Sequence, residues 1–240
     1  MAKTKSVYFC NNCGAESPKW IGRCPVCGEW NTYVEEVVST KSAAGGRGEF
    51  GTMEQSKVRP QRIDDIQITE ESRIDLGNGE LNRVLGGGLV RGSLVLIGGE
   101  PGIGKSTLIL QTVLALKGQK ILYVSGEESA RQLKLRAERI GGNAPDCYIV
   151  CETSLEDIFV HIRNVDPDIV VIDSIQTIAT SAMESSPGSV GQVRECAASL
   201  LKFAKQTNTP VLLVGHINKE GSIAGPKVLE HIVDTVFSAR

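Results

Sequence analysis

Six short runs of apolar residues recur along the chain from residue 93 onward, and each has about the length of a buried strand. They lie at about residues 93–97, 120–125, 147–151, 168–173, 210–215 and 232–238. Four stretches between them carry apolar residues at helical spacing, near 105–117, 129–140, 154–165 and 190–206. Strands that alternate with helices predict an α/β fold with a mainly parallel sheet covered on both faces. In such a sheet, ligands bind at the carboxyl ends of the strands.

The pattern changes twice before this alternating region. Residues 1–38 contain closely spaced cysteines, and residues 39–62 are small and polar with no periodicity. We expect residues 1–38 to form a small finger, residues 39–62 to form a flexible linker that uncouples it, and residues 63–240 to form the α/β core. Residues 79–88 predict a short amphipathic helix, closed by glycines, ahead of the first core strand.

The composition narrows the class of protein. Apolar residues make up 41% of the 240 residues, which is enough to fill one sizeable core. The net charge is −2, from 26 basic and 28 acidic residues, so no global field draws the protein to DNA or a membrane. No apolar run approaches the roughly 20 residues of a membrane span, and the first residues do not form a signal peptide. An odd count of seven cysteines argues against a disulfide framework, so we expect a cytoplasmic protein.

Residues 98–107 read Gly-Gly-Glu-Pro-Gly-Ile-Gly-Lys-Ser-Thr and match the spacing of a phosphate-binding P-loop. A predicted strand precedes them and a predicted helix follows, as that motif requires. Gly102 and Gly104 can adopt backbone angles closed to other residues. Lys105 is expected to reach the β- and γ-phosphates of a nucleoside triphosphate, and the Ser106 hydroxyl to bind Mg²⁺. The predicted nucleotide contacts in this loop are Gly99, Glu100, Pro101, Gly102, Ile103, Gly104, Lys105, Ser106 and Thr107.

Two carboxylates, Glu127 and Glu128, follow the second predicted core strand. One of them can orient the water that attacks the γ-phosphate, because carboxylates at such strand ends serve this purpose in nucleotide hydrolases. The alternative is helix capping, since Ser125 and Glu128 have the spacing of a capping box. Both remain catalytic candidates, and Glu127 is the preferred one.

An acid also ends the strand at 168–173, which reads Asp-Ile-Val-Val-Ile-Asp. An apolar strand that ends in aspartate is typical of the second motif of P-loop enzymes, in which the carboxylate holds the Mg²⁺ shell. We therefore expect Asp173 to lie beside Ser106, across adjacent strands, as the second Mg²⁺ contact.

Four cysteines in the finger have metal-ligand spacing: Cys10, Cys13, Cys24 and Cys27. Two Cys-x-x-Cys pairs separated by ten residues predict one tetrahedral, structural Zn²⁺, since four thiolates leave no open position for catalysis. A redox role is the alternative, but the segment is too short for a thioredoxin-like unit. Trp20 and Trp30 are expected to pack in the core of the finger; the alternative is a surface that stacks bases or docks a partner.

Two polar segments follow predicted strands. Residues 180–191 predict a mobile loop, and residues 215–227 predict a second one. In the second loop, His216 and Asn218 can sense phosphate, and Lys219 and Lys227 are candidate contacts to a nucleic-acid backbone. Both loops should emerge on the nucleotide side of the sheet, although an ordinary connection is the alternative for each.

These motifs together resemble the bacterial RadA (Sms) family of DNA repair proteins. The resemblance rests on the four cysteines, the P-loop, Val-Ser-Gly-Glu-Glu-Ser at 124–129, and the segment Gly-His-Ile-Asn-Lys-Glu-Gly-Ser-Ile-Ala-Gly-Pro-Lys-Val-Leu-Glu-His at 215–231. It extends over essentially the whole chain.

The resemblance implies a RecA-like, DNA-dependent ATPase that processes recombination intermediates in DNA repair. It implies branch migration on single-stranded or branched DNA by a ring helicase, a homo-hexamer in the full-length form, and contact with the RecA recombinase. By the same resemblance, ATP, Mg²⁺ and Zn²⁺ are the cofactors, and the loop from His216 to Lys227 acts on DNA. The family continues with a Lys-Asn-Arg-Phe-Gly motif and a Lon-like domain, so we expect this chain, which stops at Arg240, to be a C-terminally shortened core.

Other functions fit parts of the same sequence. A RecA-like ATPase that serves as a switch or scaffold without nucleic acid is the main alternative, because paired glutamates after the second strand also occur in circadian-clock ATPases. A small-molecule kinase would need a lid with several arginines, and the sequence contains no such cluster. A binding module whose ATP site only sets its shape is a further alternative. ATP hydrolysis measured with and without single-stranded DNA separates most of these functions.

Overall fold

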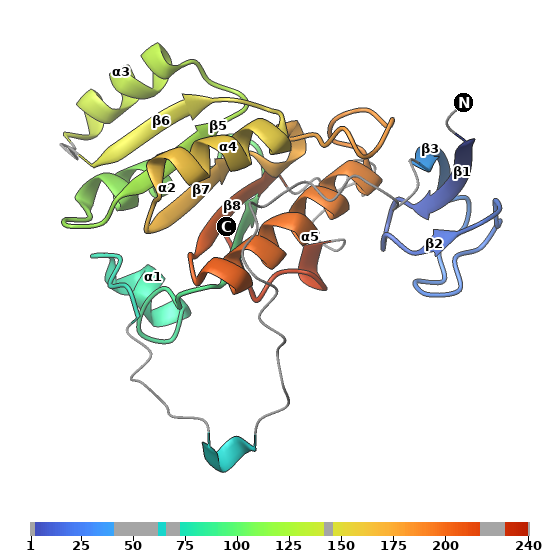
Figure 1. The fold of residues 1–240 in the computed structure, drawn as a ribbon, viewed down its shortest axis with the longest axis horizontal. Helices are drawn as coiled ribbons and strands as arrows, with labels where there is room; N and C mark the ends of the chain where they lie inside the picture. Colours follow the sequence, from blue (N-terminus) through green and yellow to red (C-terminus); the bar gives the residue numbers. More distant parts are fainter. Residues whose placement is uncertain (1–2, 41–61, 66–72, 142–145, 217–228, 240) are drawn as a thin grey trace.

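The computed structural model describes residues 3–40, 62–65, 73–141, 146–216 and 229–239 (Figure 1). Its strands are β1 (Lys3–Cys10), β2 (Glu16–Ser17), β3 (Tyr33–Thr40), β4 (Leu94–Gly99), β5 (Ile121–Ser125), β6 (Cys147–Cys151), β7 (Ile169–Asp173), β8 (Val211–His216) and β9 (Thr235–Ser238). Its helices are α1 (Gly79–Val84), α2 (Lys105–Ala115), α3 (Ala130–Ile140), α4 (Leu155–Val165) and α5 (Val190–Thr207), with short 3₁₀ turns η1 (Ile63–Asp65) and η2 (Ile175–Thr177). None of these helices is both long and apolar enough to span a membrane.

Six strands form one sheet in the order β6-β5-β7-β8-β4-β9, and every pairing in it is parallel. The predicted α/β class is confirmed. Strands that are buried on both faces read as continuous apolar runs, which is why the pattern of the sequence located them. The carboxyl ends of these strands lie at one edge of the sheet, and the loops after β4, β5, β7 and β8 therefore meet there.

Helices cover both faces of this sheet. Alternate residues of each strand point to opposite faces, so Leu94 and Leu96 of β4 pack in a buried cluster with α4 and α5. Val95 and Ile97 of the same strand pack in a second cluster with α1, α2 and α3. The two clusters make one rigid three-layer scaffold, which fixes the positions of the loops at the carboxyl edge.

The strand order corrects one expectation. Asp173 ends β7 and the P-loop follows β4, and these strands were expected to be adjacent. In the structure β8 lies between them. This order places the end of β8, and therefore His216, between the phosphate-binding loop and Asp173.

The first three strands form a separate antiparallel sheet in the order β2-β1-β3, which we call the four-cysteine ribbon (residues 3–40). The predicted linker, 39–62, lies almost wholly outside the described residues, although Ser39 and Thr40 belong to β3.

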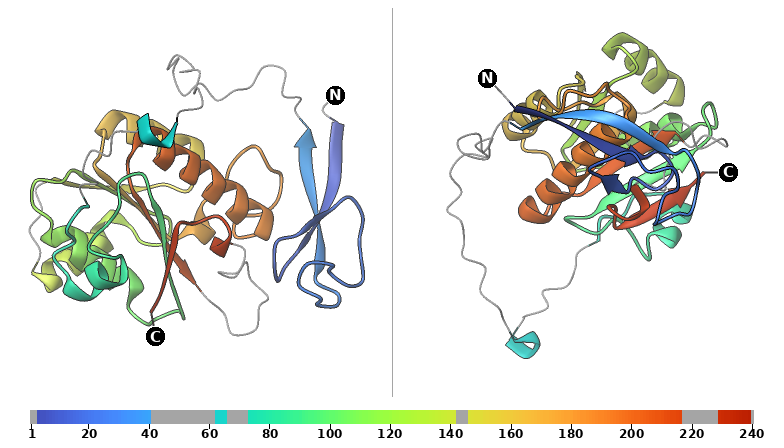
Figure 2. Two further views of the ribbon diagram at one scale, coloured as in Figure 1. Left: turned by 90° about the horizontal axis from the view of Figure 1, so that it is seen from below. Right: turned by 90° about the vertical axis from the view of Figure 1, so that its right-hand side faces the viewer.

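The ribbon packs against the core rather than being uncoupled from it. Val7 and Phe9 of β1 are each only 6% exposed and belong to the buried cluster that contains α5. Strand β1 lies beside α5 (Figure 2). Arg194 of α5 donates a hydrogen bond to the carbonyl of Gly14 at 3.0 Å. The expectation of independent modules is therefore wrong for the described part of the chain, because apolar side chains of β1 are shared with the core.

Candidate active site

The loop between β4 and α2 has the backbone that the sequence predicted. Gly102 and Gly104 adopt φ values of +80° and +97°, in the region that favours glycine. Gly104 is the N-cap of α2, so the free N–H groups of the first turn of this helix point toward the loop. Glu100, Pro101, Ile103 and Thr107 are exposed around it. An anion is stabilised in such a loop by backbone N–H groups and the helix dipole.

Lys105 lies under this loop with only 3% of its surface exposed. Its Nζ donates to the carbonyl oxygens of Gly99 and Glu100, both at 2.9 Å, and lies 3.2 Å from Nδ1 of His216. Burial lowers the pKa of Lys105, although the charges of Asp173 and Glu127 oppose this shift. The ammonium group is thus held by weak carbonyl acceptors, which a phosphate oxygen can replace.

Ser106 and Asp173 come together as the sequence predicted. The Ser106 hydroxyl donates to Oδ1 of Asp173 at 3.1 Å, although the two residues are far apart in the chain. Asp173 is 5% exposed, and its second oxygen, Oδ2, accepts a hydrogen bond from the Tyr123 hydroxyl at 2.5 Å. A hydroxyl and a carboxylate beside a phosphate-binding loop are the oxygen donors that Mg²⁺ prefers, so these residues fit that ion.

Glu127 faces the same space from the end of β5. Its Oε1 accepts a hydrogen bond from Ser174 at 2.5 Å and lies 3.1 Å from Nε2 of His216. Burial opposes ionisation, but the hydrogen bonds from Ser174 and His216 hold the pKa of Glu127 below its ordinary value. Gly126 permits this arrangement, because a Cβ there would lie 1.9 Å from Oγ1 of Thr177. The carboxylate is therefore ionised at neutral pH and aimed at the space beside Lys105.

Glu128 points elsewhere. Its carboxylate forms an ion pair with Arg136 of α3 at 2.5 Å, and its backbone N–H donates to Ser125. The capping box that begins α3 consists of Ser129 and Gln132, so the capping alternative given for Ser125 and Glu128 is wrong in its position. Of the two candidate carboxylates, only Glu127 is within hydrogen-bonding distance of His216.

His216 connects the two halves of the site. One ring nitrogen contacts Lys105 and the other contacts Glu127, so the imidazole lies between the phosphate-binding lysine and the carboxylate. Gln176 of η2 donates to the carbonyl of His216 at 3.3 Å and holds the end of β8. The other predicted residues of this loop, Asn218, Lys219 and Lys227, lie outside the described residues.

The segment at 180–191 was predicted to be a mobile loop, but in the structure hydrogen bonds hold it against Gln192 of α5. Gln192, only 1% exposed, donates to the carbonyls of Thr180, Met183 and Ser185 and accepts from the Thr180 N–H. Glu156 of α4 accepts from the Thr180 hydroxyl at 2.8 Å. A buried glutamine that makes four such bonds leaves the loop little freedom.

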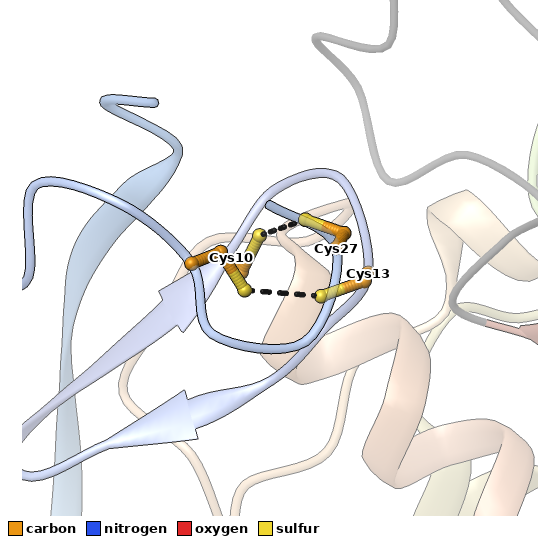
Figure 3. A group of neighbouring side chains, drawn as sticks. Cys10, Cys13 and Cys27 are labelled. Atoms are coloured by element: carbon orange, nitrogen blue, oxygen red, sulfur yellow. Dashed lines mark hydrogen bonds between the residues drawn. The ribbon is translucent and has the colours of Figure 1, made fainter. Parts of the chain in front are cut away.

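The four predicted metal ligands of the ribbon converge, and Figure 3 labels three of them, Cys10, Cys13 and Cys27. The sulfur atoms of Cys10, Cys13, Cys24 and Cys27 all lie within 4.8 Å of one another. Burial opposes ionisation of Cys24, but hydrogen bonds from the backbone N–H groups of Cys27 and Val26 lower its pKa to about 6. Four thiol groups that converge in this way fit one tetrahedral ion.

The two tryptophans are not core residues. Trp20 is 53% exposed and Trp30 is 67% exposed, so the expectation that they pack inside the finger is wrong. Cys10, Cys24 and Tyr33 fill the small interior instead. Arg23 lies over the Trp30 ring at 5.8 Å from its centre, and the surface alternative for these side chains remains a prediction.

Comparisons with known proteins agree with both parts of the fold. Residues 57–222 match the AAA domain family, and residues 8–35 match the rubredoxin metal binding domain. The DNA repair protein RadA of Bacillus subtilis (strain 168) is 55% identical over 239 residues, which are 99% of this chain and 52% of that protein. RadA of Listeria monocytogenes is 51% identical over 98% of the chain, and RadA of Pseudomonas aeruginosa is 49% identical over 99% of it. The chain thus spans about half the length of these relatives.

The comparisons and the structure lead to one assignment. The family match covers most of the chain, the parallel sheet carries a P-loop after β4, and the relatives match from the ribbon to the last strand. The chain therefore belongs to the AAA domain family, and the resemblance to the bacterial RadA proteins that its motifs indicated is confirmed.

Proposed function

We propose that this chain binds ATP with Mg²⁺ at the loop between β4 and α2 and hydrolyses it. The observation that carries the proposal is that His216 joins Lys105 and Glu127: one ring nitrogen lies 3.2 Å from the Lys105 ammonium and the other lies 3.1 Å from the Glu127 carboxylate. A positively charged lysine at the phosphates and a residue that orients the attacking water are recurring parts of sites that transfer a phosphoryl group to water.

Each residue then has a defined task. The backbone N–H groups of the loop hold the phosphates, and Lys105 exchanges its carbonyl partners for phosphate oxygens. Ser106 and Asp173 would hold Mg²⁺, and the ion would supply positive charge beside the phosphates. Glu127 accepts a hydrogen bond from the attacking water and orients it. His216 leaves its position between Lys105 and Glu127 when the γ-phosphate enters. The conformation at the end of β8 therefore depends on whether ATP is bound.

DNA is the proposed partner of this ATPase. The support is the name of the relatives, DNA repair protein RadA, together with Lys219 and Lys227, which follow His216 in the chain. A loop that contacts ATP at one end and DNA at the other couples ATP hydrolysis to the affinity for DNA. Branch migration by a hexameric ring, contact with the RecA recombinase and a cytoplasmic location are proposals for the full-length protein. In the four-cysteine ribbon, the proposed ion is a structural Zn²⁺.

The test is ATP hydrolysis measured with and without single-stranded DNA, with the Lys105→Ala variant as the control. Removal of the lysine should lower turnover by roughly two orders of magnitude while circular dichroism stays unchanged, because a transition-state donor is lost and the packing is not. Wild-type turnover in the variant would contradict the assignment of the site. Normal hydrolysis that DNA does not stimulate would favour the alternative of a switch or scaffold without nucleic acid.

A further inference from the structure

Tyr123 contacts Asp173, the residue whose carboxylate faces Ser106, and the proposed mechanism gives this tyrosine no role. Tyr123 is fully buried in the cluster beneath α2 and α3, on a strand whose neighbouring positions are aliphatic. A buried tyrosine costs free energy unless its hydroxyl finds a partner. Here the partner is Oδ2 of Asp173 at 2.5 Å, a short and charge-assisted hydrogen bond.

The geometry points to Tyr123 as a positioning residue for Mg²⁺, acting through Asp173 at the ATP site. This inference rests on the proposed ATPase function. Asp173 lies opposite Ser125 in the register of β5 and β7, so Tyr123 reaches it diagonally from two residues back on the same face. The hydrogen bond fixes the plane of the carboxylate and leaves Oδ1 turned toward Ser106.

The two oxygens of Asp173 are thus divided between two hydroxyl groups. A Ser106 hydroxyl that would bind the metal through its oxygen would keep its proton for Oδ1 of Asp173, and Tyr123 would hold the other carboxylate oxygen, Oδ2, in place.

The experiment compares Tyr123→Phe with the wild type and with Tyr148→Phe, a control on the adjacent strand β6 where the side chain is 47% exposed. Binding of a fluorescent ADP analogue is measured while Mg²⁺ is titrated, and again in EDTA. Loss of a group that orients a metal ligand typically weakens metal affinity 10- to 100-fold. Tyr123→Phe should raise the Mg²⁺ concentration for half-maximal binding about tenfold, and it should leave nucleotide affinity in EDTA unchanged.

An unchanged Mg²⁺ requirement in Tyr123→Phe would overturn the inference, even if the melting temperature fell, because that pattern describes packing alone. A wild type that binds the analogue without any dependence on Mg²⁺ would instead contradict the proposed function. If Tyr123→Phe does not fold, 3-fluorotyrosine at position 123 retains both the ring and the hydroxyl. Its fluorine NMR signal should shift when Mg²⁺ is added to the ADP-bound protein, and the signal from fluorotyrosine at position 148 should not. No shift at position 123 would refute the role.

Discussion

Removal of the metal ion proposed for the four-cysteine ribbon should destabilise the P-loop core, although the two lie in different sheets. The interior of the ribbon consists of Cys10, Cys24 and Tyr33, so without the ion it has too little core to stay folded. The surface of β1 that covers α5 would then be lost. A chelator is therefore a perturbation of the core as well as of the ribbon.

The magnitude follows from the contacts between ribbon and core. The hydrogen bond from Arg194 to the Gly14 carbonyl involves a charged group and contributes about 1.5–3 kcal/mol. Burial of Val7 and Phe9, which belong to the cluster that contains α5, contributes at most about 1.5–3 kcal/mol for each side chain. One kcal/mol shifts the melting temperature of a domain of this size by about 2–4 °C. Chelation should lower the melting temperature of the core by on the order of 10 °C.

The assay is differential scanning calorimetry with and without a chelator under reducing conditions, alongside a zinc determination expected to give about one ion per chain. Arg194→Ala should lower the melting temperature by a few degrees and reduce the further shift caused by chelation, because part of the contact is already gone. Lys202→Ala, an exposed site on the same helix, is the matched control. A core transition that chelation leaves unchanged would show that the ribbon is only tethered and would refute the reasoning.

Two further predictions concern the loop after β8 and the carboxylate at the site. Lys219→Ala combined with Lys227→Ala should leave basal ATP hydrolysis nearly unchanged and abolish its stimulation by single-stranded DNA. The salt dependence of DNA binding should fall by about two phosphate contacts per subunit. An unchanged salt dependence would show that the loop is an ordinary connection. Glu127 has a lowered pKa in the folded state, so the stability it contributes is present above its ordinary pKa of 4.5 and is lost as the pH falls through the folded value. Ser174→Ala removes one of the hydrogen bonds that lower this pKa and so moves it back toward 4.5, which makes the acid-dependent loss smaller. Melting curves recorded between about pH 3 and 6 should show a smaller fall in stability for the variant than for the wild type, and an equal fall would contradict the assignment.

Most of the core could be predicted from the sequence because its signals are local. The strand at 169–173 is buried on both faces, and the P-loop carries its own glycines at the positions with positive φ. The approach of Ser106 to Asp173 was also predictable, since Asp173 ends one parallel strand, Ser106 follows another, and the carboxyl ends of both strands lie at one edge of the sheet.

Contacts between distant segments could not be predicted in the same way. In the sheet, β8 lies between β4 and β7. Neither the hydrophobic periodicity of the sequence nor its turn residues determine this order of strands. The hydrogen bonds from Tyr123 and Ser174 to the acidic side chains were missed for this reason. A tyrosine in an otherwise aliphatic strand was the one signal for the first of them.

The errors in the ribbon have a different cause. Tryptophan is usually buried, and this preference led to the wrong expectation for Trp20 and Trp30. In a unit held together by four sulfur atoms, the ligands themselves form the interior and leave no room for indole rings. The apolar side chains of β1 then belong to the core of the neighbouring sheet.

The most direct test of the central claim is turnover by Glu127→Gln, since this change keeps the shape of the side chain and removes its charge. ATP hydrolysis should fall by about a hundredfold or more, as expected for loss of a group that activates water, while the affinity for ATP with Mg²⁺ stays within a few-fold of the wild type. Glu128→Gln, which breaks the ion pair with Arg136, should reduce turnover far less. Wild-type turnover in Glu127→Gln, or a larger loss in Glu128→Gln, would contradict the account.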